Sequence, residues 1–164
     1  MDHSSPKRER RHIHLCGEES LNDYLKNRAL QARKATGTVT WVIPHRERII
    51  GYYSSVFGDI EQAQAPRKAA GAVHPYPVPY LKIARLAVDN NYKGQGLGAV
   101  LVLHALQQAA TASDMAGLRM VVVDALKADV VHFYEKFGFK RYDDLSMFVL
   151  IKDVKKTLET LGPV

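Results

Sequence analysis

The chain has 164 residues, of which 46% are hydrophobic and 24% charged, a composition typical of one globular domain rather than of a disordered chain. Its 23 Lys and Arg outnumber its 17 Asp and Glu, and the net charge of +6 favours polyanionic partners such as nucleic acid. The single cysteine excludes an internal disulfide, the histidines show no metal-ligand spacing, and no apolar run reaches the roughly 18 residues that cross a bilayer, so we expect a cytoplasmic protein with no metal and no membrane segment.

In chain order the patterns alternate between helix and strand, which predicts an α/β fold. Residues 1–11 form a basic arm that we expect to be flexible, followed by a single domain over 12–164. The first half predicts a short strand at 13–15, a helix at 18–34, strands at 38–43 and 48–54 broken at Pro44, and an irregular proline-rich loop at 62–79. The second half predicts a strand at 80–88, a helix at 97–110, a strand at 118–125, a helix at 129–137 and a last strand at 145–152.

Basic residues are frequent in the arm and again in the predicted helix at 18–34, which contains Lys26, Arg28, Arg33 and Lys34. Such a surface attracts nucleic acid. The same pattern also fits a solvated helix face beside an unstructured tail, and for the arm both interpretations stay open.

The most informative segment is 91–98, Asn-Tyr-Lys-Gly-Gln-Gly-Leu-Gly, because it lies between a predicted strand and a predicted helix. Glycines leave room for main-chain N–H groups to surround an anion, and a helix N-terminus attracts one. The spacing matches neither the nucleotide P-loop nor the dinucleotide fingerprint. We therefore predict an anion site formed by Lys93, Gly94, Gln95, Gly96, Leu97 and Gly98, the alternative being a glycine-rich helix cap without a ligand.

This loop resembles the acyl-CoA pyrophosphate loop of the GNAT acetyltransferase superfamily, although Asn91 stands where that pattern has Gln or Arg. The segment 133–139, Phe-Tyr-Glu-Lys-Phe-Gly-Phe, is similar to the C-terminal signature of the same superfamily. There a tyrosine protonates the departing CoA thiolate, a role that the resemblance gives to Tyr134. Taken alone, Tyr134 fits a core tyrosine with a hydrogen-bonded hydroxyl better than a catalytic residue, and the glycine loop that precedes it in the chain reverses this preference.

The resemblance implies a mixed, mostly antiparallel central sheet with two splayed strands, flanked by helices. It makes acetyl-CoA the cosubstrate and assigns the pantetheine to the backbone of Leu86, Ala87 and Val88, with the N–H of Ala87 or Val88 polarising the thioester carbonyl. Arg85 on the same strand either faces the acceptor or forms a structural ion pair.

Within the superfamily, the segments 16–26, 50–53 and 84–89 look like those of GNAT-type toxins from bacterial type II toxin-antitoxin modules. The resemblance implies acetylation of the α-amino group of aminoacyl-tRNA, which blocks translation, a small DNA-binding antitoxin as partner, and a homodimer. An α-amine suits the matched motifs, because its pKa of about 8 leaves roughly a tenth of it neutral at pH 7 without a dedicated base.

Three other functions stay open at this point. The first is a GNAT acetyltransferase that acts on a small amine or a protein N-terminus. The second is a non-enzymatic nucleic-acid-binding module whose loop grips backbone phosphate, and the third is a regulatory partner that binds CoA without catalysis.

Overall fold

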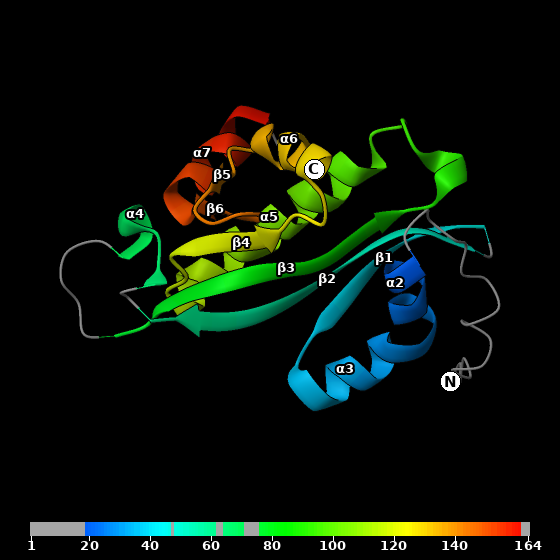
Figure 1. The fold of residues 1–164 in the computed structure, drawn as a ribbon, viewed down its shortest axis with the longest axis horizontal. Helices are drawn as coiled ribbons and strands as arrows, with labels where there is room; N and C mark the ends of the chain where they lie inside the picture. The colour runs from blue at the N-terminus through cyan, green and yellow to red at the C-terminus, as the bar shows by residue number, and fades with distance from the viewer. Residues whose placement is uncertain (1–18, 47, 62–63, 71–75, 162–164) are drawn as a thin grey trace. The chain divides into compact units, whose positions relative to one another are not determined.

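The computed structural model describes residues 19–46, 48–61, 64–70 and 76–161 (Figure 1). The predicted arm at 1–11 and the predicted strand at 13–15 lie outside these residues. The described chain forms two compact units: a first unit of residues 19–46, 48–55 and 85–101, and a second unit of residues 56–61, 64–70, 76–84 and 102–161. The strands are hydrogen-bonded in the order β1-β2-β3-β4-β6-β5, which confirms the mixed, mostly antiparallel sheet.

In the first unit, the predicted helix at 18–34 is confirmed as a continuous helical stretch made of α2 (Glu19–Asp23), a π-helical turn η2 (Tyr24–Arg28) and α3 (Ala29–Thr36). Gly37 ends it in the left-handed conformation, with φ of 71°. The helical stretch buries Leu21 and Tyr24 in a small core that also contains strand residues Tyr52 and Ala87.

The prediction that Pro44 breaks the first strand is wrong. β1 (Val39–His45) continues through Pro44, and its antiparallel pairing with β2 (Arg48–Ile60) shifts register between Ile43 and Pro44. β1 is the edge strand of the sheet, where a residue without an N–H leaves fewer bonds unmade and is accommodated by a local irregularity.

The chain of the first unit resumes with the end of β3 (Val78–Val88), followed by the 3₁₀ turn η4 (Asn90–Tyr92) and the start of α5 (Leu97–Ala116). β3 and α5 confirm the predicted strand and helix, although α5 continues six residues past the predicted end at 110.

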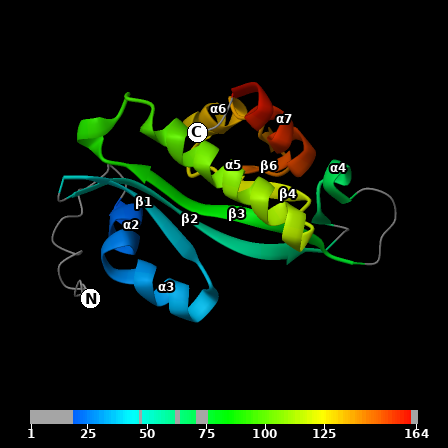
Figure 2. The same cartoon turned by 180° about the vertical axis from the view of Figure 1, so that it is seen from behind.

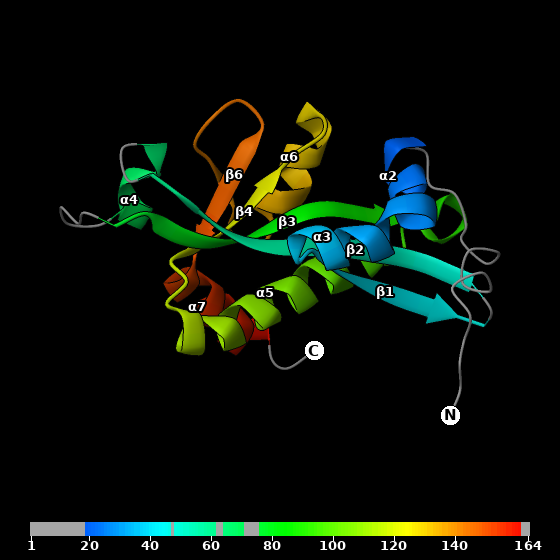
Figure 3. The same ribbon diagram turned by 90° about the horizontal axis from the view of Figure 1, so that it is seen from below.

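In the second unit, β4 (Met120–Asp124) pairs parallel with β3 at Tyr80–Ile83 and antiparallel with β6 (Ser146–Leu150), beside which lies the short β5 (Lys140–Arg141). α6 (Ala128–Glu135) lies on one face of β4, and the C-terminal part of α5 lies on the other face with α7 (Ile151–Leu161) (Figures 2 and 3). Lys155 of α7 contacts Asp114 of α5 at 2.9 Å, which ties the two helices together.

Two expectations for the second unit need correction. The predicted irregular loop contains a helical turn, α4 (Arg67–Ala70), and its last residues belong to β3, which starts at Val78. The predicted last strand at 145–152 ends at Leu150, and Ile151 already begins α7, a helix that was not predicted. In the predicted loop, Ala69 of α4 is buried with Val78, Met120 and Phe148, so side-chain packing stabilises this helical turn.

No helix in the described part of the chain is long and apolar enough to pass through a bilayer.

Candidate active site

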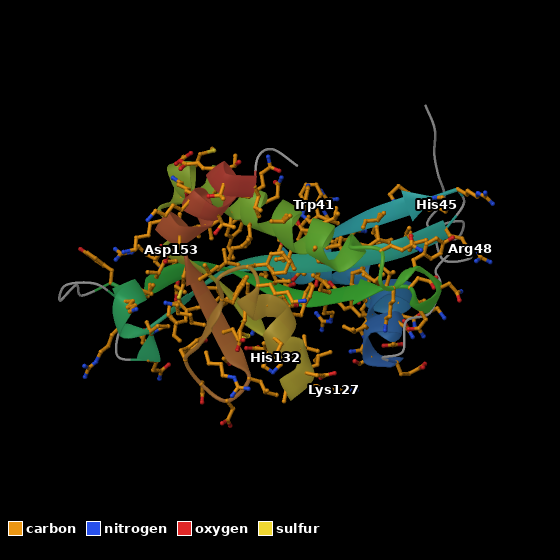
Figure 4. All side chains as sticks on the ribbon, turned by 90° about the horizontal axis from the view of Figure 1, so that it is seen from above. Trp41, His45, Arg48, Lys127, His132 and Asp153 are labelled. Atoms are coloured by element: carbon orange, nitrogen blue, oxygen red, sulfur yellow. The ribbon has the colours of Figure 1, made fainter. Side chains whose placement is uncertain are left out.

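The turn between β3 and α5 is held by Asp89, which is 3% exposed. Its carboxylate accepts a hydrogen bond from the Asn91 N–H at 2.8 Å, and its own N–H donates to the Ile50 carbonyl at 2.8 Å. His45 at the end of β1, labelled in Figure 4, meets the Tyr92 ring edge-on with centroids 5.6 Å apart. The hairpin formed by β1 and β2 therefore holds the turn that leads into the glycine loop.

The glycine loop has the backbone that an anion cradle requires. Gly94 and Gly96 both have φ of 79°, a left-handed conformation that other residues adopt only with strain. A Cβ added to either glycine would meet nothing within 4 Å, so the backbone conformation, and not crowding, explains the glycines. The first turn of α5 then forms with the Val100 N–H donating to the Gly96 carbonyl at 3.1 Å.

The loop also leaves space for a ligand. Its residues Lys93, Gly94, Gln95 and Gly96 are exposed, and Leu97 and Gly98 are partly buried where they begin α5. The first N–H groups of a helix lack partners within the helix, and its dipole makes that end positive. Exposed amides, a helix N-terminus and the Lys93 ammonium together fit a diphosphate.

Asn91, which stands at the Gln or Arg position of the motif, has an exposed side chain that makes no hydrogen bond to any described residue. Its main-chain N–H is the group that Asp89 engages. The residue thus serves the turn through its backbone, and its side-chain amide remains accessible from the solvent.

At the end of β3, the main-chain N–H and C=O groups of successive residues point to opposite edges of the strand. The Ala87 carbonyl oxygen lies 3.4 Å from the position that a Cβ on Gly51 would take, and the Asp89 N–H reaches Ile50. Both partners belong to β2. Because successive residues of a strand turn their main-chain groups to opposite edges, Val88 directs its N–H away from β2. Leu86 follows the same alternation, so the edge of β3 opposite β2 carries the amides of Leu86 and Val88.

A small hollow lies in the first unit, lined by residues of its helical stretch and of its strands. Ala87 and Val88 form part of its wall, facing Asn22 and Leu25 of the helical stretch, with Tyr52 of β2 beside them. Most of these side chains are apolar, so the hollow brings the predicted reactive strand next to a largely apolar surface.

Tyr134 belongs to α6 in the second unit and is 4% exposed. Its ring packs edge-on against Phe133 and Phe139, with centroids 5.1 and 5.5 Å away. Burial raises the pKa of the Tyr134 hydroxyl well above its ordinary value of 10, so it keeps its proton at neutral pH. Its hydroxyl makes no hydrogen bond to another described residue.

Arg85 lies over a ring rather than beside a carboxylate. Its guanidinium carbon is 3.9 Å from the centroid of Tyr24, and it forms no ion pair with any residue that the structure describes. The sequence did not predict Tyr24 as part of the site, nor Asp89 as the residue that holds the turn. An aspartate directly after a strand and before Asn-Asn is a turn signal that could have indicated Asp89.

Comparison with known proteins identifies the family of the chain. Residues 36–141 match the acetyltransferase (GNAT) domain family. A tRNA-acetylating toxin of Mycobacterium tuberculosis (strain ATCC 25618 / H37Rv) is 36% identical over 141 residues, which cover 85% of this chain and 84% of the toxin.

Solved structures are similar as well. AtaT complexed with acetyl-methionyl-tRNAfMet has a TM-score of 0.78 and 25% identity, covering 93% of this chain and 91% of that one. A tyrosine-to-phenylalanine mutant of the AtaT toxin, bound to the C-terminus of the antitoxin AtaR and acetyl-CoA, has a TM-score of 0.75 and 25% identity, covering 94% and 90%.

The chain belongs to the GNAT acetyltransferase family. The predictions of a GNAT fold and of an N-acetyltransferase are thereby confirmed.

Proposed function

We propose that this protein is a toxin that transfers the acetyl group of acetyl-CoA to the α-amino group of aminoacyl-tRNA and so blocks translation. The observation that carries the proposal is the 36% identity to a tRNA-acetylating toxin across 85% of the chain. The glycine loop supports it, because its left-handed Gly94 and Gly96 and the start of α5 form a suitable diphosphate site.

Each part of the site has a role in this reaction. Lys93, Gly94, Gln95, Gly96, Leu97 and Gly98 bind the diphosphate of acetyl-CoA, and Leu86, Ala87 and Val88 line its pantetheine. Of the two amides predicted to polarise the thioester carbonyl, strand alternation favours Val88 over Ala87. Tyr134 supplies the proton that the leaving thiolate takes up, and its hydroxyl carries that proton at neutral pH.

The acceptor requires little help from a base. An α-amine is partly neutral at pH 7, and attack on the carbonyl releases a proton that water can accept. The exposed cations Arg28, Arg33 and Lys34 on the helical stretch, and Arg46 and Arg48 at the hairpin, supply charge that would hold the tRNA backbone.

We further propose that residues 12–164 act as one catalytic domain that works in the cytoplasm, where aminoacyl-tRNA is found. A small DNA-binding antitoxin neutralises it, a proposal supported by the structures of AtaT bound to the C-terminus of the antitoxin AtaR and of the AtaT-AtaR complex bound to DNA. The protein acts as a homodimer, which light scattering of the purified protein would test directly.

The deciding experiment incubates the purified protein with acetyl-CoA and a pool of charged tRNA and analyses the aminoacyl ends by mass spectrometry. We expect acetylated aminoacyl-tRNA, and growth arrest on expression that co-expression of the antitoxin relieves. Acetylation of polyamines or protein N-termini with untouched tRNA would contradict the proposal and indicate a different acceptor for the same chemistry.

A further inference from the structure

Among the described residues, Arg85 is a cation that packs on a ring and not beside a carboxylate. Its side chain is partly buried, its guanidinium rests 3.9 Å from the centroid of the Tyr24 ring, and no carboxylate of the described residues pairs with it. Removing a charge from water without a partner is unfavourable, and stacking on a ring recovers only part of that cost. None of the five N–H donors of the guanidinium bonds to a described residue, so they can bind the oxygens of a carboxylate or a phosphate.

Tyr24 is itself fixed in place. It is 3% exposed and stacks on Tyr52 with centroids 6.2 Å apart and ring planes 18° apart. The Tyr52 hydroxyl donates to the Leu21 carbonyl at 2.7 Å. The Tyr24 hydroxyl lies 3.5 Å from that of Thr40 on β1. The Tyr24 ring that packs on Arg85 is thus held by contacts with the helical stretch, β2 and β1.

A local change in the helix begins at this residue. Tyr24 is the first residue of the π-helical turn, in which the Ala29 N–H donates to the Tyr24 carbonyl five residues back. A π-helical turn rotates the side chains that follow it relative to a regular helix, and such turns occur frequently at functional sites. Here the turn lies directly opposite the strand that carries Arg85 and Ala87.

Position along β3 indicates which anion Arg85 would meet. Arg85 and Ala87 are two residues apart on one face of the strand, about 6.7 Å along it. If the acceptor amine reacts at the amide of Val88, Arg85 lies three residues, about 10 Å, back along β3 from it, which is comparable to the distance from the α-amine across one aminoacylated nucleotide to its 5′ phosphate. The nearest anion of an aminoacyl-tRNA to its α-amine is the phosphodiester that joins the last two nucleotides.

We propose that Arg85, held in position by Tyr24, binds the phosphodiester on the 5′ side of the terminal adenosine of the acceptor. This inference rests on the proposed function and deepens it. Arg85 is the residue that touches the substrate, through two parallel N–H···O bonds to the phosphate. Tyr24 is a positioning residue that acts through Arg85.

A comparison of two small acceptors measures the effect of this phosphodiester contact alone. Aminoacyl-adenosine has no phosphodiester, whereas aminoacyl-cytidylyl-adenosine has one, and both carry the aminoacyl group that the tRNA experiment identifies. We expect the wild type to favour the dinucleotide in kcat/KM by about 10- to 100-fold, the range of a charge-assisted contact. Arg85→Gln should abolish this preference, mainly through the KM of the dinucleotide, and change the kcat/KM of the nucleoside far less.

The ratio of the two substrates is measured on one preparation, so a change in the folded fraction cancels. Tyr24→Phe keeps the ring and should keep the preference, while Tyr24→Leu should reduce it. The double variant Tyr24→Leu with Arg85→Gln should be no worse in this ratio than Arg85→Gln alone. Arg85→Lys, which keeps the charge but loses the planar fork, should fall between the wild type and Arg85→Gln.

Several results would overturn the inference. If the wild type acetylates aminoacyl-tRNA but does not distinguish the two small acceptors, or if Arg85→Gln impairs both equally, Arg85 has only a structural role. An unchanged ratio in Tyr24→Leu would remove Tyr24 as the positioning residue. Failure of the wild type to acetylate intact aminoacyl-tRNA would refute the proposed function, a different and separately visible outcome.

Discussion

At the scale of single residues, Tyr134 carries the clearest prediction. Replacing it by Phe removes only the proton donor and keeps the ring that packs on Phe133 and Phe139. We expect acetyl transfer to fall by about 10²-fold or more, the usual cost of a lost general acid, with acetyl-CoA affinity nearly unchanged. Steady-state rates and calorimetry with acetyl-CoA measure the two effects.

The matched control for this change is Tyr142→Phe. Tyr142 is another ring of the second unit, 5.8 Å from Phe148, and it is not part of the proposed site. Its loss of a hydroxyl should leave the rate as in the wild type. Turnover by Tyr134→Phe equal to that of the control would exclude Tyr134 as the acid.

The protonation state of Tyr134 also predicts the pH profile. Burial raises its pKa above 10, so the proton stays on the hydroxyl throughout the range in which the acceptor amine titrates. The amine must be neutral to attack, so kcat/KM should rise about tenfold per pH unit below pH 8 and level off above it. Initial rates between pH 6 and 9 test this, and a descending limb in that range would show that the acid loses its proton earlier than burial implies.

At the scale of elements, the glycine loop gives a prediction with a control from the same unit. Gly96→Ala places a Cβ on a residue with φ of 79°, which favours a different backbone and moves the amides of the loop. We expect acetyl-CoA to bind about tenfold more weakly, the effect of losing one hydrogen bond to a charged group. Calorimetry measures the affinity, and thermal unfolding measures the accompanying loss of about 1 kcal/mol of stability.

Gly37→Ala separates strain from binding. Gly37 has φ of 71° at the end of α3, and a Cβ there would also meet nothing within 4 Å. It should cost similar stability and leave acetyl-CoA affinity intact. If both variants bind acetyl-CoA equally well, the loop at 94–98 is a helix cap and not the diphosphate site.

The elements also show which features a sequence can predict. Helices with caps and glycine ends, such as the stretch that stops at Gly37, are encoded locally and were predicted. The boundary between β6 and α7 was missed because the apolar run passes from Leu150 to Ile151 without a turn residue, and the Ile151 N–H still bonds to the Arg119 carbonyl. The break at Pro44 was predicted wrongly because a proline is tolerated within a strand at the edge of a sheet. The position of β1 at the edge is a property of the whole sheet.

Some features of the candidate site can likewise be predicted from the sequence, whereas others depend on the fold. The left-handed Gly94 and Gly96 follow from a local motif, so the sequence could indicate them. The contact between Arg85 and Tyr24 joins a strand to a helix far away in the chain, and the π-helical turn that supports it contains no glycine or proline to mark it. The choice of Val88 over Ala87 needed the partners of β3, which only the fold provides.

At the scale of the whole molecule, the charge of +6 predicts how the two substrates respond to salt. Aminoacyl-tRNA is a polyanion whose binding releases counterions, and acetyl-CoA carries only a few charges. Three phosphate contacts would raise the KM for aminoacyl-tRNA by more than about tenfold between 50 and 200 mM salt, whereas the KM for acetyl-CoA should change much less.

Charge-removal variants connect this bulk effect to particular residues. Arg33→Gln combined with Lys34→Gln removes two exposed cations at the end of α3, outside the loop and the reactive strand. If these cations contact tRNA phosphates, the variant should show a shallower salt dependence of the aminoacyl-tRNA KM, with the same kcat and the same KM for acetyl-CoA. A wild-type KM for aminoacyl-tRNA that is insensitive to salt would mean that the basic surface does not hold the substrate, and that recognition is confined to the acceptor end.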